Sequence, residues 1–138
     1  RDWSSDVCSS DLLRADPASL AIRAELARLY AATDRPKEAA DVCREGLAFS
    51  PHYPILQGLW AYAALVVLSS ASQPELGEVL ASELEAYPVD SPDGWYWLSQ
   101  VRTQQGRTEQ ATLSRANAVE LAPNLTEADY RRRLETGQ

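Results

Sequence analysis

The chain has few of the residues on which metal and thiol chemistry usually depend. Its 138 residues include two cysteines, one histidine and six glycines. Only Cys43 lies outside a polar opening segment, and one cysteine cannot close an intramolecular disulfide. His52 lies nine residues from Cys43, which is the spacing of neither a metal site nor a Cys/His catalytic pair. We therefore expect no metal site, with Cys43 in the core and His52 in a solvated turn.

Long apolar runs, glycine-rich loops and an excess of basic residues are also missing. The longest apolar run, Leu59–Leu68, is shorter than the roughly 20 residues that cross a bilayer. No glycine-rich phosphate-binding motif is present. The net charge of −7 disfavours general binding to nucleic acid. The sequence therefore predicts no membrane span, no nucleic-acid partner and no cofactor in this chain; its location stays open, with the cytoplasm favoured.

The first twelve residues, RDWSSDVCSSDL, have neither apolar periodicity nor the features of a targeting segment. Their back-translation resembles a widely used short-read sequencing adapter. We predict that residues 1–12 are an artefact and exclude them from the fold. Without them the net charge becomes −5, because one arginine and three aspartates are removed.

Two later segments share one order of helix, polar turn, helix and proline. The first runs from Ala18 to Pro51 and the second from Asp93 to Pro123. Small and apolar residues recur in the same order along both. They are Leu26, Ala27, Tyr30, Ala39, Leu47 and Pro51 in the first segment, and Trp95, Leu98, Gly106, Ala111, Ala118 and Pro123 in the second. A pattern repeated at this length indicates an array of helical repeats.

Each of these residue types has a physical role in packing paired helices. Small residues such as Ala27 let helices approach closely, while leucines and Val119 fill the space between repeats. The closing prolines end the second helix of each segment. Gly106 can take the positive φ that closes a first helix. Asp34 and Pro36 predict an N-cap or turn followed by an early-helix proline.

The pattern resembles the tetratricopeptide repeat, in which a Trp/Leu, Leu, Gly/Ala and Tyr series precedes an Ala, aromatic, Ala series and a closing proline. The resemblance implies an all-α superhelix, a solenoid of antiparallel helix pairs. The predicted parts are the end of a lost upstream repeat at 13–17, repeat 1 at 18–51, a degenerate repeat 2 at 52–88, repeat 3 at 89–123, and a C-terminal capping helix and tail at 124–138.

Two segments outside the matched repeats also predict helices. Residues 54–70 are apolar on nearly every side, so we expect them to form the most buried helix. In 74–88 the acidic residues flank a leucine stripe, which favours a solvated face over a catalytic pair. These residues are Glu75, Glu78, Glu83 and Glu85.

A last short helix is predicted after Thr126, which can cap it, and extends to about Leu134. Repeat arrays need a solvating final helix, because the last repeat otherwise exposes its packing face. We expect Tyr130 and Leu134, four residues apart, to lie on the second helix of repeat 3. The arginines 131–133 are then expected to stay in water.

The resemblance further implies a concave groove, lined by the first helices, that binds a peptide or a partner's helix. The register places in it the groove candidates Arg28, Tyr62, Leu65, Tyr96, Gln100 and Gln104. Tyr62 is equally consistent with a core position. Family members that grip a chaperone's terminal carboxylate use lysine, asparagine and arginine in this groove. Here Ala24, Arg28, Asp93 and Trp97 stand at those positions, so chaperone tails are not the expected partner.

The sequence therefore favours a scaffold for protein–protein interaction over an enzyme. Two alternatives remain open. One is a helical recruitment segment of a longer enzyme or membrane-associated protein. The other is a self-assembly element, in which self-association through the truncated end is a further possibility.

Overall fold

The structure is a computed structural model that describes residues 19–69 and 74–136. Within these ranges the chain forms seven α-helices and no β-strand. They are α2 (Leu20–Ala32), α3 (Pro36–Phe49), α4 (Pro54–Ser69), α5 (Pro74–Ala86), α6 (Pro92–Gln104), α7 (Thr108–Leu121) and α8 (Glu127–Thr136). The predictions made for residues 1–12 and 13–17 lie outside the described residues.

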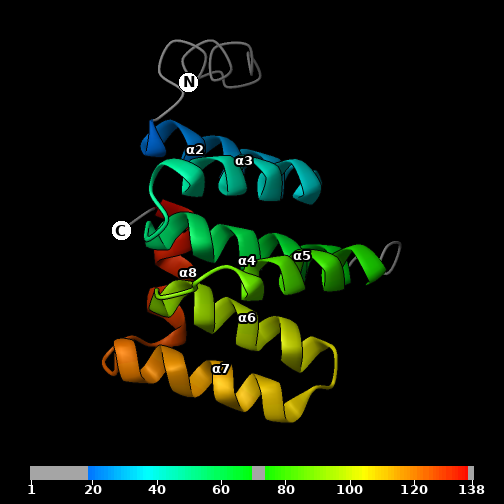
Figure 1. Cartoon of the computed structure of the whole chain (residues 1–138), viewed down its shortest axis with the longest axis vertical. Helices are drawn as coiled ribbons and strands as arrows, with labels where there is room; N and C mark the ends of the chain where they lie inside the picture. Colours follow the sequence, from blue (N-terminus) through cyan, green and yellow to red (C-terminus); the bar gives the residue numbers. More distant parts are fainter. Residues whose placement is uncertain (1–18, 70–73, 137–138) are drawn as a thin grey trace.

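Six of the helices form three pairs that stack in chain order. Figure 1 shows α2/α3, α4/α5 and α6/α7 as successive layers along the long axis of the molecule, with α8 running across them. Each pair is joined to the next through α4, which contacts both α3 and α6. The prediction of an all-α helical repeat solenoid is confirmed.

Two turns have the backbone geometry that the sequence predicts. Gly106, two residues after α6, has a φ of 77°, which glycine adopts without strain. Asp34 has a φ of 63°, in the left-handed region that aspartate tolerates better than most residues. Asp34 is therefore a turn residue, while the N-cap position before Pro36 belongs to Arg35.

Helix α4 is the centre of the core, as its apolar sequence predicts. It contacts α2, α3, α5, α6 and α8, and ten of its residues are buried, more than in any other described helix. At Gly58 an added Cβ atom would lie 3.0 Å from the Cβ of Asp93, so α4 and α6 approach closely there. No helix within the described ranges has the length and apolar character of a membrane span.

The residues predicted to pack the repeats divide into core and turn positions. Those buried in the core are Leu26, Ala27, Ala39, Leu47, Leu98, Ala111 and Ala118. Tyr30 and Trp95 pack partly buried against the core, while Pro51, Gly106 and Pro123 lie exposed in turns. Val119 is 49% exposed, because no described helix covers that side of α7.

A buried arginine joins the second and third pairs. Arg102 of α6 is 2% exposed, and its guanidinium binds both Glu78 and Glu85 of α5. Its Nη1 atom lies 3.0 Å from Glu78 Oε2, and Arg107 lies 2.6 Å from the other oxygen of Glu78. Glu75, Glu83 and Glu85 are exposed, as a solvated face requires, while Glu78 is half-buried. Glu78 and Glu85 also balance a buried positive charge, which the sequence did not predict.

The ion pairs change the acidity of Glu78. Burial alone would raise the pKa of its carboxyl group above the ordinary 4.5. Hydrogen bonds from Ser82 and Arg102, together with the charges of Arg102 and Arg107, outweigh burial and lower the pKa to about 2. Glu78 therefore stays ionised in the folded chain under conditions in which it is protonated in the unfolded chain.

We expect Glu78→Gln to lower the free energy of unfolding at pH 7 by about 2 kcal/mol. The lowered pKa measures the stabilisation by the ion pairs, and solvent screens part of that stabilisation. The stabilisation is complete above the unfolded pKa of 4.5 and is lost as the pH falls towards 2. Urea titrations followed by circular dichroism should therefore show the difference between wild type and variant shrinking with acidity. Glu75→Gln, at an exposed position of the same helix, is the control. A difference independent of pH would contradict the prediction.

Candidate functional site

The candidate site is the surface on which α8 lies. The first helix of each pair contributes to it, because α8 reaches α2, α4 and α6 in turn. We call it the α8-binding surface and define it by five residues. They are Arg28 of α2, Tyr62 of α4, and Asp93, Tyr96 and Trp97 of α6. Figure 1 shows α8 leaving the α7 end of the stack and running back towards the earlier pairs.

An aromatic cluster forms the α6 part of this surface. The rings of Tyr96 and Tyr130 stack with centroids 4.2 Å apart and an angle of 7° between their planes. Tyr96 and Tyr62 both meet Trp97 edge to face, at 5.0 and 5.1 Å. Burial raises the pKa of the phenol groups of Tyr96 and Tyr130, so both remain neutral. Such ring pairs contribute roughly 0.5–1.5 kcal/mol each beyond the burial of their area.

An ion pair with a buried carboxylate lies beside the aromatic cluster. Arg133 of α8 binds both oxygens of Asp93, with Nη2–Oδ1 at 2.8 Å and Nε–Oδ2 at 3.1 Å. Asp93 is 2% exposed and lies in the first turn of α6. Burial raises the pKa of its carboxyl group, and the charge and hydrogen bonds of Arg133 oppose that rise. The two-point geometry suits a guanidinium and cannot be reproduced by an ammonium group.

A buried glutamine fixes the start of α6 and with it the position of Asp93. Gln57 of α4 is fully buried, and its Oε1 accepts hydrogen bonds from the backbone N–H and the hydroxyl of Ser91, at 3.2 and 2.8 Å. Ser91 is the N-cap of α6, and its Oγ accepts from the N–H of Gly94 at 3.0 Å. The sequence contained a signal for this contact, because Gln57 interrupts an otherwise apolar helix, but the signal does not identify the partner.

The far end of α8 lies against the first two pairs. Nε of Arg28 donates a hydrogen bond to the backbone carbonyl of Leu134 at 2.8 Å. The Leu134 side chain borders a pocket of about 370 Å³. The pocket is lined by Arg28, Ala31, Ala32, Leu59, Tyr62, Leu134 and Glu135. The surface therefore continues past α8 as a largely apolar hollow that Arg28 and Glu135 also line.

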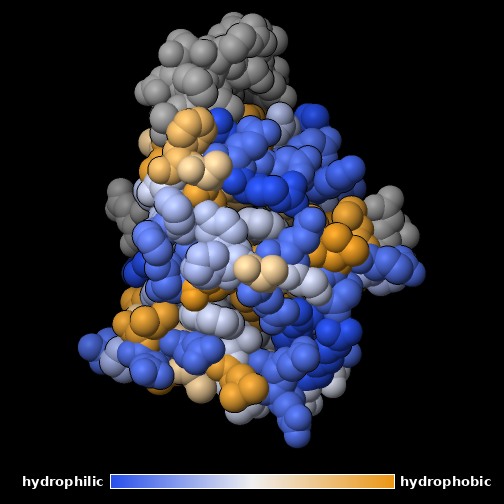
Figure 2. Space-filling view, in the orientation of Figure 1, coloured by the Kyte–Doolittle hydropathy of each residue, from blue (hydrophilic) through white to orange (hydrophobic). Residues whose placement is uncertain are grey.

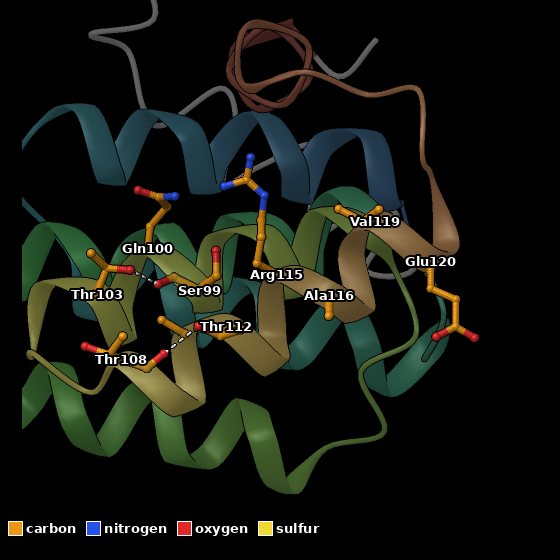
Figure 3. A pocket seen from close by; sticks show the side chains of 10 residues that line it. Ser99, Gln100, Thr103, Thr108, Thr112, Arg115, Ala116, Val119 and Glu120 are labelled. Atoms are coloured by element: carbon orange, nitrogen blue, oxygen red, sulfur yellow. Dashed lines mark hydrogen bonds between the residues drawn. The ribbon is translucent and has the colours of Figure 1, made fainter.

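Three of the predicted groove residues meet at this surface, and three do not. Arg28, Tyr62 and Tyr96 contact α8 or border the hollow beside it. Leu65 packs partly buried against the core, and Gln104 is the exposed last residue of α6. Gln100 lines a different pocket, of about 660 Å³, between α6 and α7 (Figure 3). Asp93 and Trp97 were noted in the sequence only as departures from a carboxylate clamp.

The predicted position of the last helix is wrong. Tyr130 and Leu134 were expected on α7, but they are buried against the first helices of the pairs. Of the three arginines expected in water, Arg131 and Arg132 are exposed, but Arg133 binds Asp93. The guanidinium of Arg131 lies 5.6 Å from the centroid of the Trp97 ring. The reason is electrostatic: the buried carboxylate of Asp93 needs a counter-charge, and the adjacent Tyr96 ring offers a stacking partner.

Because α8 lies elsewhere, no described helix covers the outer side of α7. Leu113 is 67% exposed, and Leu121 and Val119 are about half exposed. Figure 2 shows apolar patches among hydrophilic residues over α7. Figure 3 shows Arg115 and Gln100 projecting from α7 and α6 on the pocket side. The guanidinium of Arg115 also lies 5.1 Å from the Tyr96 ring, so the pocket adjoins the aromatic cluster.

The described residues contain no group of three or more His, Cys, Asp or Glu side chains that could hold a metal ion. Cys43 is buried, and burial raises the pKa of its thiol, which keeps it protonated. His52 is exposed beside Asp90. No protein-family model matches the chain, and a search of curated proteins also finds no match. The α8-binding surface itself therefore provides the basis for a functional inference.

The contacts predict how firmly α8 is held. We expect Arg133→Gln to speed amide hydrogen exchange in α8 by about 10–100-fold, because a charged hydrogen-bonded pair contributes about 1.5–3 kcal/mol. Arg132→Gln is the matched control, since Arg132 is exposed and pairs with Asp129 within the same helix. Exchange measured by NMR or mass spectrometry should change little in the control. Equal effects of the two substitutions would show that the Asp93 pair does not hold the helix.

Proposed function

We propose that the chain is a protein-interaction module that binds a helical segment of a partner protein on the α8-binding surface. One observation carries the proposal: an amphipathic helix already lies there, held by a ring stack, a two-point ion pair and a buried leucine. These are the contacts by which helix-in-groove complexes form, with anchors at i, i+3 and i+4. A surface that binds a helix of its own chain through these contacts has the chemistry to bind a helix of another protein.

We also propose that the three helix pairs are repeats of the tetratricopeptide type. Support comes from the fully or nearly fully buried small residues Ala27, Ala39 and Ala118, which stand at matching positions of the pattern. The positive φ of Gly106 after the first helix of the last pair agrees with it as well. In this type of array the first helices line the binding face, which is where α8 is found.

The anchors of a bound partner follow from residue type and burial. Aromatic and arginine side chains at the centre of an interface usually contribute most of its binding free energy. Tyr96 and Tyr62 offer ring faces and edges, and Arg28 offers a donor for a carbonyl at the end of a helix. We expect these three residues to dominate the affinity for a partner helix.

Selection from a random peptide library on the full chain and on its Tyr130→Ala variant tests the proposal. Binding of the selected peptides, measured by fluorescence anisotropy, is expected to weaken at least tenfold in Tyr96→Leu and Arg28→Ala chains. Glu109→Gln, at an exposed position of α7, should bind as the wild type does. Circular dichroism excludes unfolding of each variant. If the selected peptides are indifferent to Tyr96 and Arg28, the surface is not their binding site and the proposal fails.

Self-assembly is a second candidate function, favoured by the outer side of α7, which no described helix covers. Leu113 and Val119 are exposed there, next to the pocket between α6 and α7. A second copy would cover these side chains by stacking on the last pair.

Sedimentation equilibrium across a concentration series separates this candidate from a monomer. We expect Leu113→Glu to abolish any self-association, because a charge would be buried in the contact. Val79→Glu is the matched control, since Val79 is equally apolar and is exposed on α5. Association that survives Leu113→Glu, or that Val79→Glu also removes, would place the contact elsewhere.

A further inference from the structure

We infer that α8 is a ligand held within its own chain, and that the α8-binding surface selects partner helices with an aromatic residue, an arginine three positions later and a leucine four positions later. A partner of this chemistry exchanges with α8. The inference deepens the proposed function and rests on it, since it names both the partner's side chains and the segment that competes with them.

Helix α8 buries few of its side chains. Of its ten residues only Tyr130 and Leu134 are buried, and Arg133 is partly buried. The other positions are exposed except for Asp129, which caps the helix with Thr126. A ten-residue helix is only marginally stable by itself in water. Its attachment therefore depends mainly on these three side chains, together with the bond from Arg28 to the Leu134 carbonyl and the contact of Arg131 with the Trp97 ring. A competing helix can supply the same groups.

Most of the core lies outside α8. The buried cluster around α4 is formed by α2 to α7, and from α8 only Tyr130 and Leu134 enter it. Five residues, 122–126, join α7 to α8, and among them Pro123 cannot continue the preceding helix. Departure of α8 thus removes a helix from the surface of the stack without separating the helix pairs.

The choice of arginine follows from Asp93. Asp93 is 2% exposed. While α8 is bound, the two hydrogen bonds from Arg133 compensate the burial of its carboxylate. A partner with a neutral residue at this position leaves that charge buried and unpaired, and an acidic residue adds repulsion. A lysine forms a single-point contact and fits less well. The surface therefore discriminates by penalising helices that lack the arginine.

The preference for an aromatic residue and a leucine beside the arginine follows from the spacing of these residues along the helix. On a helix, residues three and four positions apart lie on one face, so Tyr130, Arg133 and Leu134 present one continuous edge. Along this edge Tyr130 meets α6, and Leu134 lies beside α2 and α4. The hollow next to Leu134 has a volume of about 370 Å³ and is bordered by Leu59 and Tyr62. It leaves room for a larger apolar side chain at the leucine position.

The test uses a labelled peptide of residues 124–136, NLTEADYRRRLET, added to the full chain. Binding is followed by fluorescence anisotropy with the wild-type chain and with a Tyr130→Ala/Arg133→Ala chain, in which α8 is loosened. We expect the loosened chain to bind the peptide at least tenfold more tightly, because the wild-type surface is already occupied. Circular dichroism must show that the loosened chain keeps its helices.

Peptide variants test the chemistry. Arg133→Ala in the peptide should abolish binding, whereas Arg132→Ala should not, since Arg132 faces solvent in α8. Leu134→Phe should bind at least as well as the parent peptide. Asp93→Asn in the loosened chain should remove the preference for arginine over alanine. These four results together support the inference.

Other results overturn it. Equal binding by the wild-type and loosened chains shows that α8 does not compete. Equal binding of the Arg133→Ala and Arg132→Ala peptides shows that Asp93 does not select for an arginine at position 133 of the helix. Exchange of α8 between two copies, seen as a dimer that Arg133→Ala dissociates, makes a second copy the occupant and not a partner. If library peptides bind through Tyr96 and the α8 peptide does not bind, the inference fails while the proposed function stands. If no peptide binds through Tyr96, both fail.

Discussion

The close approach of α4 to α6 is the constraint on which the rest of the structure depends. Glycine at position 58 permits it, because a side chain there would meet Asp93. The approach brings Gln57 within hydrogen-bonding distance of the N-cap Ser91, and this bond sets where α6 begins. Asp93 is thereby buried in the first turn of α6, where its charge requires a partner. Arg133 supplies the opposite charge and so determines where the last helix lies.

Much of the fold could be predicted from the sequence, because helix formation and burial depend on the pattern of nearby residues. The alternation of small and large apolar residues in 18–51 and 93–123 indicates paired helices, and Asp34 and Gly106 mark their turns. The apolar character of 54–70, which Gln57 interrupts, predicts a central helix. Each of these features depends on residues within one or two helical turns, for which the physical rules are specific.

The candidate site was only partly predictable. The resemblance to a repeat pattern implied that Arg28, Tyr62 and Tyr96 share one face, and that face is where α8 lies. The position of α8 itself depends on Asp93 and Arg133, which are 40 residues apart and look like ordinary solvated charges in the sequence. Arg102 was missed for the same reason, since its two glutamate partners lie on another helix. A pattern shows which side chains are apolar or charged, but not which distant charge will compensate a buried one.

The hydrogen bond from Arg28 to the carbonyl of Leu134 joins residues 106 positions apart and connects the first described helix to the last. In an ordinary repeat array each unit contacts only its neighbours, so its ends fray independently and stability is a sum of local terms. Here the last helix contacts both α6 and α2. Fraying of α2 breaks this bond, so the two ends are coupled for as long as α8 is bound. The coupling adds contacts of long sequence separation, and chains rich in such contacts fold more slowly than arrays of local ones.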